Sequence, residues 1–275
     1  MKLNVTNRLA SLLVALTTAV VWAAPQGGAT NVFAPEFFAF QNGVGPMTFE
    51  DQAAMLKALG YDGVSQVGRG GERLASRIAA YDKVGQKVLS IYLNVNDKPI
   101  AADVVKPLAN RDAMIELTVR QMTPTTIEAV RATAAMAAEM RIRVALYPHD
   151  GFAIATMPQA LQLIADVNHP NLGVMFNLCH FLKGESIDDL ESALEAAGPH
   201  LFGASISGAT LGGTTWAELI QPLDQGDFPQ IRVLKALKRL NFSGPVGLQC
   251  FAVPGDKRNN LKRSMAAWQK ALAEL

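Results

Sequence analysis

Two histidines end short apolar segments and could exchange protons near neutral pH. His149 closes the segment "VALYPH" and His180 closes the segment "GVMFNLCH". Imidazole titrates close to pH 6.5, so it can serve as a general acid or base without a large change in its pKa. Tyr147 precedes His149 by two residues and adds a hydroxyl that can donate a proton or a hydrogen bond. These three residues are the catalytic candidates.

The remaining histidines and the two cysteines are expected to be structural. His169 and His200 each precede an expected strand, so they should lie at the end of the fold opposite the candidate site. Cys179 and Cys250 stand near the ends of two expected strands with a third strand between them. Two strand spacings of ~4.8 Å exceed the Cα separation of ~7 Å that a disulfide can bridge, so both thiols should be free. A reactive Cys179–His180 pair is disfavoured because neighbouring residues on a strand point to opposite faces.

Extended and helical patterns alternate along the chain and must position these side chains. The expected strands are 32–40, 63–67, 88–95, 115–120, 144–147, 173–178, 202–207 and 246–249. The expected helices are 48–59, 72–84, 125–139, 158–166, 187–197, 229–240 and 260–273, with at most a short helix in 101–110. Thr48 with Asp51 and Thr125 with Glu128 resemble capping boxes at two of the helix starts.

Eight strand–helix units in about 250 residues are typical of a (β/α)₈ TIM barrel. The sequence therefore predicts one such domain over residues 31–275. An open, doubly wound sheet is the alternative, but the G-x-G-x-x-G motif of dinucleotide-binding sheets does not follow the first expected strand. A glycine-rich turn, "VGRGGER", follows the second strand and could cradle an anion, although a plain loop is the simpler interpretation.

The interior of the predicted barrel is unusually polar. Alternation along each strand turns the following side chains inward: Ser90, Tyr92, Asn94, Glu116, Thr118, Arg120, Tyr147, Asn177, Ser205, Ser207 and Gln249. Many stand near the C-terminal ends of strands, which form the active face of a TIM barrel. Hydroxyl and amide groups suit a polyhydroxylated ligand such as a sugar. The candidate substrate-binding residues are Tyr92, Arg120, Asn177, Ser205 and Gln249; Arg120 could bind an anionic group or pair with Glu116.

Charge and the first residues bear on partners and location. The formal charge is +1, which gives no electrostatic basis for binding nucleic acid or an anionic membrane. Lys2 and Arg8 precede an apolar run, and small residues follow it, with Val21 and Ala23 at the −3 and −1 positions of a cleavage site. This pattern predicts a signal peptide over residues 1–23 and a secreted or periplasmic protein. An anchor helix is the alternative, but the run of about fifteen residues is shorter than the ~20 that span a bilayer, so no stable membrane anchor is expected.

Five segments resemble motifs of one known family. They are "VALYPHDGF", "NLGVMFNLCH", "GASISGA", "IQPLDQGDF" and "GPVGLQC". In order and spacing they are similar to the motifs of the fifth to eighth strands of xylose-isomerase-like TIM barrels, a superfamily of sugar phosphate isomerases and epimerases. The resemblance covers residues 31–275 and implies a barrel that acts on a sugar.

The resemblance also implies a divalent cation held by a Glu, an Asp, a His and a second Glu. The matching positions here are Tyr147, Asn177, Ser205 and Gln249, while family histidines are retained at His149 and His180. No anionic ligand remains at these positions, so no metal and no other cofactor is expected. Tyr147 would then donate a hydrogen bond or simply fill the space of the metal.

The resulting functional hypothesis is a sugar isomerase or epimerase in which His149 and His180 carry protons without the family's metal. Asn177, Ser205 and Gln249 would orient the hydroxyls of a small-molecule carbohydrate. Two alternatives stay open: a non-catalytic carbohydrate-binding relative, and a metal-independent lyase or hydrolase of modified sugars.

Overall fold

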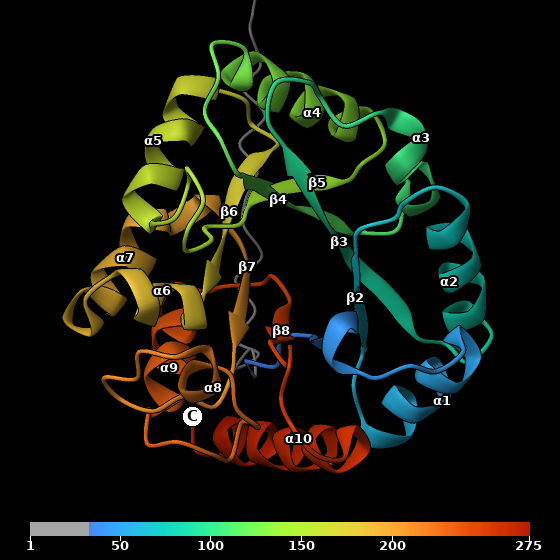
Figure 1. Ribbon diagram of the computed structural model, residues 1–275, viewed down its shortest axis with the longest axis vertical. Coiled ribbons are helices and arrows are strands. Elements are labelled where there is room, and N and C mark those ends of the chain that lie inside the picture. The colour runs from blue at the N-terminus through green and yellow to red at the C-terminus, as the bar shows by residue number, and fades with distance from the viewer. Residues whose placement is uncertain (1–32) are drawn as a thin grey trace, which may run out of the picture. The chain divides into compact units, whose positions relative to one another are not determined.

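A closed barrel of parallel strands forms the centre of the computed structural model, which describes residues 33–275 (Figure 1). These residues contain eight strands paired in chain order, and the barrel closes where β1 pairs with β8. The strands are β1 Phe37–Phe40, β2 Gly63–Val67, β3 Lys87–Val95, β4 Met114–Val119, β5 Arg143–Leu146, β6 Leu172–Asn177, β7 Leu201–Ile206 and β8 Val246–Leu248. The predicted (β/α)₈ barrel is confirmed.

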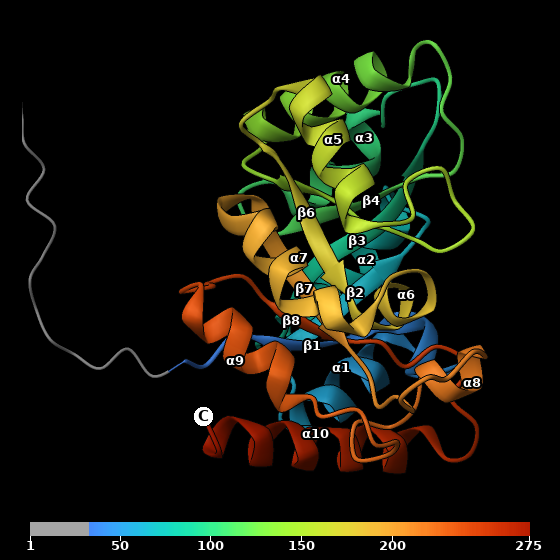
Figure 2. The same cartoon turned by 90° about the vertical axis from the view of Figure 1, so that its left-hand side faces the viewer.

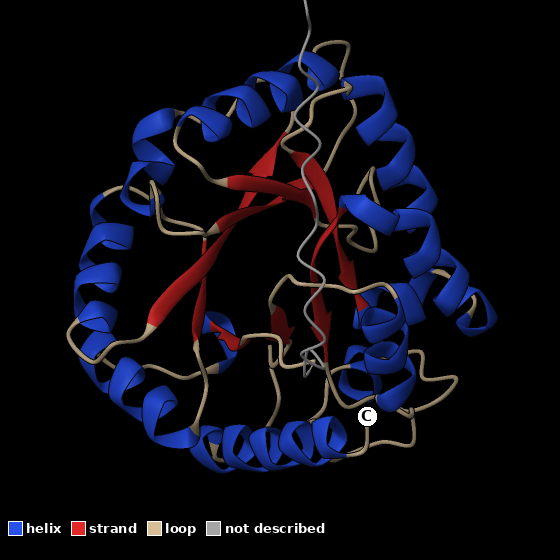
Figure 3. Cartoon of the chain, turned by 180° about the vertical axis from the view of Figure 1, so that it is seen from behind, coloured by secondary structure: helices blue, strands red, loops and turns tan. Residues whose placement is uncertain are grey.

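Helices form a ring around the strands, as the view from behind also shows (Figure 3). They are α1 Phe49–Leu59, α2 Glu72–Asp82, α3 Ala102–Val105, α4 Thr126–Glu139, α5 Met157–Val167, α6 Leu178–Gly184, α7 Leu190–Ala197, α8 Trp216–Leu219, α9 Ile231–Arg239 and α10 Lys257–Ala273. Short 3₁₀ turns occupy Gln41–Gly43, Lys106–Leu108, Ile187–Asp189 and Gly198–His200. Within residues 33–275, every helix is too short or too polar to span a bilayer. The predicted signal peptide, residues 1–23, lies outside the described residues.

Predicted and observed boundaries differ by three residues or fewer in all but one place, and two of the differences have a clear cause. The first strand was expected from residue 32 but begins at Phe37, because Pro35 has no N–H group to donate to a neighbouring strand. The other strands lie within one residue of their predicted bounds. The second error is at the end of β6, where the expected strand included Leu178. A helix begins there instead, so His180 lies in the first turn of α6.

The two predicted capping boxes had different outcomes. At α1, the hydroxyl of Thr48 accepts the backbone N–H of Asp51 at 3.1 Å, as expected. At α4, the Thr125 hydroxyl donates instead to the carbonyl of Asp97 at 3.2 Å. Capping boxes also occur at two helix starts that were not predicted to have them, α5 and α8.

Aromatic side chains fill part of the barrel interior beneath the mouth. The rings of Phe38 and Phe40 lie 5.6 Å apart on β1. Gly247 on β8 leaves room for both, since a Cβ atom there would stand 2.7 Å from Phe38 and 2.8 Å from Phe40. These side chains fill the barrel below its mouth, so the space for a site lies at the C-terminal ends of the strands.

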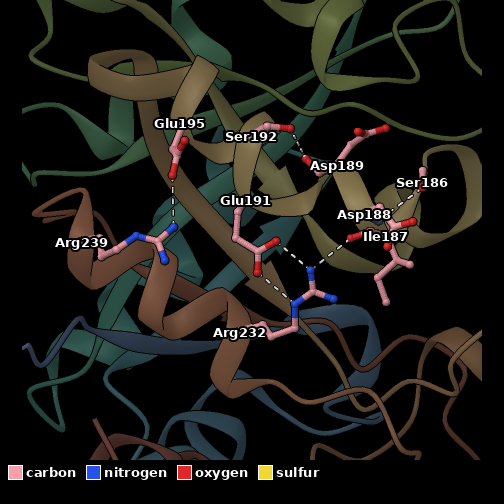
Figure 4. A network of polar contacts seen from close by, with 9 residues as sticks. All are labelled: Ser186, Ile187, Asp188, Asp189, Glu191, Ser192, Glu195, Arg232 and Arg239. Carbon is pink, nitrogen blue, oxygen red and sulfur yellow. Dashed lines mark hydrogen bonds and ion pairs between the residues drawn. The ribbon is translucent and has the colours of Figure 1, made fainter.

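Two ion pairs link the neighbouring helices α7 and α9 of the outer ring (Figure 4). The guanidinium of Arg232 binds both oxygens of Glu191, at 2.9 and 2.7 Å, and lowers the pKa of that carboxyl. Arg239 contacts Glu195 at 3.1 Å. Because all four side chains are at least partly exposed, each pair contributes at most about 1 kcal/mol. The network therefore joins the helices and does not mark a site.

Candidate functional site

A cavity of about 260 Å³ opens at the C-terminal ends of the strands. Five predicted site residues line it: Tyr92, Tyr147, His149, His180 and Gln249. They come from β3, the ends of β5 and β8, and the first turn of α6. The structure thus brings together all three catalytic candidates and two of the five candidate binding residues.

One residue between the two histidines sets the orientation of both rings. The Nδ1 atom of His149 lies 2.8 Å from the carbonyl oxygen of Asp150. A carbonyl only accepts hydrogen bonds, so Nδ1 carries the hydrogen and the neutral ring keeps a lone pair on Nε2. The backbone N–H of Asp150 donates to Nδ1 of His180 at 3.2 Å. Neutral His180 therefore carries its hydrogen on Nε2. The two rings, 4.0 Å apart, present one acceptor and one donor.

Burial keeps both imidazoles neutral. It lowers the pKa of His180 to about 3, with a further contribution from the nearby His149. Burial is also the main cause that lowers the pKa of His149. At pH 7, therefore, His149 can accept a proton, and His180 acts as a neutral hydrogen-bond donor.

Tyr147 forms the wall beneath the histidines. Its ring meets that of Tyr92 edge-on at 5.1 Å and that of His180 at 5.8 Å. Burial raises its pKa well above the usual value, so the hydroxyl stays protonated. This hydroxyl accepts a hydrogen bond from Nε2 of Gln249 at 3.2 Å, which leaves its own hydrogen available to a ligand.

Gln249 is fixed at both ends of its amide. Its Oε1 accepts the backbone N–H of Phe251 at 3.1 Å, and its Nε2 donates to Tyr147. An amide nitrogen carries two hydrogens, so one remains for a ligand in the cavity. The residue predicted to bind substrate from β8 thus presents a donor of fixed orientation.

Asn177 and Ser205 are paired with each other outside the cavity lining. They stand opposite one another on β6 and β7, and the Ser205 hydroxyl donates to Oδ1 of Asn177. Both are buried. Within the described chain, Nδ2 of Asn177 has no hydrogen-bond partner, so this donor is still unused.

Arg120 lies at the rim of the site. It follows the last residue of β4 and is exposed. Its guanidinium stands 4.8 Å from the ring centroid of Phe152, which stacks on His149 at 4.0 Å. Two roles were considered for Arg120, and pairing with Glu116 is wrong. The guanidinium of Arg120 instead packs on Phe152, whose ring stacks on His149.

Glu116 is a buried carboxyl inside the barrel. Its Oε1 accepts hydrogen bonds from the hydroxyls of Ser65, at 3.1 Å, and Ser90. Counting partners among residues 33–275 only, Oε2 has none. Burial raises the pKa of Glu116 to about 7, against the opposing effect of the two serine hydroxyls.

Other residues that line the cavity were not predicted from the sequence, among them Asn42, Trp216 and Phe251. Trp216 begins α8, whose capping box of Thr215 and Glu218 is visible in the sequence as "TWAE". That signal could have placed a helix, and an aromatic residue, in the connection after β7. Asn42 lies in the 3₁₀ turn Gln41–Gly43 and Phe251 in the turn after β8, and neither carries a comparable signal.

Two further predictions concern residues around the site. The glycine-rich turn after β2 is a plain loop, because Gly68 and Gly71 donate their N–H groups to the carbonyls of Tyr92 and Val104. Cys179 and Cys250 are free and buried, as expected.

The four positions that the resemblance assigns to metal ligands carry neutral side chains. Across residues 33–275, no three His, Cys, Asp or Glu side chains gather into a group that could hold a metal ion. Tyr147, Asn177, Ser205 and Gln249 instead form hydrogen bonds in two pairs.

Comparison with known proteins identifies the family. The sequence profile described as xylose isomerase-like TIM barrel matches residues 69–272. No curated protein sequence matches the chain significantly.

Solved structures share the fold at low sequence identity. The apo form of 3-keto-D-glucoside 4-epimerase from E. coli is 16% identical, with a TM-score of 0.67 over 86% of this chain and 99% of that chain. An L-ribulose 3-epimerase is 13% identical, with a TM-score of 0.70 over 88% of this chain and 95% of that chain. The IOLI protein with a bound zinc atom is 15% identical, with a TM-score of 0.66 over 87% of this chain and 98% of that chain. With its closed barrel and its profile match over most of the length, this chain belongs to the xylose isomerase-like TIM barrel family.

Proposed function

We propose that this protein moves a proton at the carbon next to a sugar carbonyl, as an isomerase or epimerase, without a divalent metal. The observation that carries the proposal is the histidine pair, in which Asp150 fixes His149 as a proton acceptor and His180 as a hydrogen-bond donor. Removing such a proton requires a base on the carbon and donors on the carbonyl oxygen, which becomes negatively charged.

His149 would be the base, because Nε2 holds a lone pair and the ring is neutral at pH 7. His180 would donate its Nε2–H to the developing oxyanion. Tyr147 and Gln249 each have an unused hydrogen and would add donors on the same wall. Fixed donors in a buried site stabilise a developing charge far more than water does.

The chemistry of the donor set supports metal independence. A hydroxyl and two amides take the places where the resemblance implies carboxylates, and hard divalent cations favour anionic oxygen ligands. Neutral amides bind such ions weakly, and they are already hydrogen-bonded here. In this proposal, hydrogen-bond donors take over the stabilisation that a cation would otherwise give to the enolate oxygen.

The proposed location is the periplasm or the outside of the cell, on the strength of the signal-peptide pattern in residues 1–23. The proposed partner is a small carbohydrate. A non-catalytic carbohydrate-binding relative is the second candidate, because every family metal position has been replaced by a neutral side chain.

Exchange of substrate hydrogen with D₂O tests the proposal. The protein would be incubated with aldoses, ketoses and keto-glycosides, and deuterium next to the carbonyl would be followed by NMR. Because the pKa of His149 is lowered, the exchange rate should be constant from about pH 7 upward and should fall only in acid. Binding of sugars without any deuterium uptake would overturn the proposal and favour the second candidate.

A further inference from the structure

Exposed apolar side chains gather at one end of the barrel. Among residues 33–275, the large hydrophobic side chains with high exposure are Met47, Met122, Leu211, Trp216 and Phe251. Four of them lie in segments that follow a strand and precede the next helix, and Trp216 begins the short helix α8 in the connection after β7, so all five surround the mouth. Two of them, Trp216 and Phe251, also line the cavity.

Trp216 is held in place although it is 39% exposed. Its ring meets His180 edge-on at 5.1 Å, and the ammonium group of Lys183 stands 5.7 Å from its centroid. The short helix α8 begins with the capping box of Thr215 and Glu218, and it lies beside α6, on the same side of the barrel (Figure 2). A fixed aromatic face toward solvent is a platform for a ligand, since the ring loses little freedom on binding.

Phe251 is 52% exposed and is also held by local structure. Its N–H is bound by Gln249, a residue of the site itself. The next residue, Ala252, has a left-handed backbone with φ of 55°, which is uncommon for a residue with a Cβ atom. This conformation shapes the turn that presents the phenyl ring.

The cavity accommodates one sugar ring and little more. Its volume of about 260 Å³ lies just below the ~300–1,000 Å³ of most ligand cavities. Trp216 and Phe251 contribute to its walls and also extend into solvent, where an isolated monosaccharide would leave them uncovered. Apolar area of this kind favours a ligand that covers it.

We infer that the ligand is a glycoside, with its glycosyl ring in the cavity and the ring of its aglycone, a second sugar or another ring, against Trp216 and Phe251. The inference rests on the proposed function for the identity of the first ring as a sugar. It goes further in naming the class of substrate and two residues that determine specificity.

The glycosidic bond restricts the chemistry. It fixes the anomeric carbon as an acetal, so the bound ring cannot open to an aldehyde or ketone. Proton transfer on that ring then needs a ketone at another ring carbon. The reaction that supplies the substrate must therefore be the oxidation of a ring hydroxyl of a glycoside, by a separate enzyme with its own oxidant.

Calorimetric titration of the full chain tests the inference without any turnover. The probes are methyl and phenyl glycosides of glucose, galactose, mannose and xylose, in both anomeric forms. At least one phenyl glycoside should bind about tenfold more tightly than its methyl counterpart, the ratio expected when one aromatic contact is added. In Trp216→Ala and in Phe251→Ala the ratio should fall toward one.

Leu211→Ala is the matched control, because Leu211 is equally exposed on the same face but lies outside the cavity lining. It should leave the ratio unchanged, and thermal melts would verify that each variant is folded. Equal binding of methyl and phenyl glycosides, or no binding of either, would overturn the inference.

A second measurement separates this inference from the proposed function. Deuterium uptake would be compared between the best-bound glycoside and the derivative in which one ring hydroxyl is oxidised to a ketone, at each ring position in turn, and only such a derivative should exchange. If the phenyl preference holds but no such derivative exchanges, proton transfer is wrong, while the glycoside inference stands.

Discussion

Replacing His149 with alanine should lower the rate of solvent-deuterium uptake by a factor of about 10²–10⁴, the usual contribution of a general base. The lone pair on Nε2 is lost, and the other imidazole that lines the cavity, His180, has its own lone pair on Nδ1 engaged by the N–H of Asp150. NMR in D₂O measures the effect directly. Unchanged exchange in this variant would remove His149 from the mechanism.

Two further variants sharpen this result. His180→Gln should lose less than His149→Ala, since a glutamine amide can both accept from the N–H of Asp150 and donate to the substrate oxygen. His169→Ala is the control. His169 lies before β6, at the opposite end of the barrel, where its Nδ1 accepts the N–H of Asn171 at 3.1 Å. It should leave exchange unchanged.

The difference in unfolding free energy between Glu116→Gln and wild type should shift in favour of the variant by about 3 kcal/mol between pH 4.5 and pH 8. The pKa of Glu116 is about 7 in the folded chain, against 4.5 for an ordinary glutamate. Between these values the unfolded chain releases the proton while the folded chain retains it, so wild-type stability falls by about 1.4 kcal/mol per pH unit. Below pH 4.5 this loss is absent, and above pH 7 it is complete.

Denaturant unfolding of both proteins at several pH values measures this difference. Glutamine cannot ionise, so the variant lacks the loss, and all other titrating groups cancel in the comparison. Glu139→Gln, an exposed position at the end of α4, serves as the control and should change stability by no more than about 0.5 kcal/mol at each pH. A pH-independent difference between wild type and Glu116→Gln would show that the carboxyl is not held neutral.

The barrel and its polar interior could be predicted because both follow from local patterns. Alternation in "VLSIYLNV" and "IELTVRQ" turned Ser90 and Glu116 inward, and the two are hydrogen-bonded in the structure. The same alternation turned Tyr147 and Gln249 inward, and the two are hydrogen-bonded although they stand 102 residues apart in the sequence. The face that a strand residue takes depends only on the two-residue alternation of the strand, and this alternation is visible in the sequence.

The error at His180 has a different origin. The run "FNLCHFL" is mostly apolar, and such a run does not distinguish a strand end from a buried helix. The structure starts α6 at Leu178, so His180 enters the site from a helical turn, where it meets the N–H of Asp150. That contact depends on how the loop after β5 meets α6 in space, so the opposite tautomers of the two histidines could not be read from the sequence.

The central claim is that two histidines move a proton in this barrel without a divalent cation. Its most direct test is elemental analysis of the purified protein, paired with deuterium exchange before and after treatment with EDTA. The account predicts a substoichiometric divalent metal content and the same exchange rate after chelation. A stoichiometric divalent ion, whose removal abolishes exchange and whose return restores it, would contradict the account.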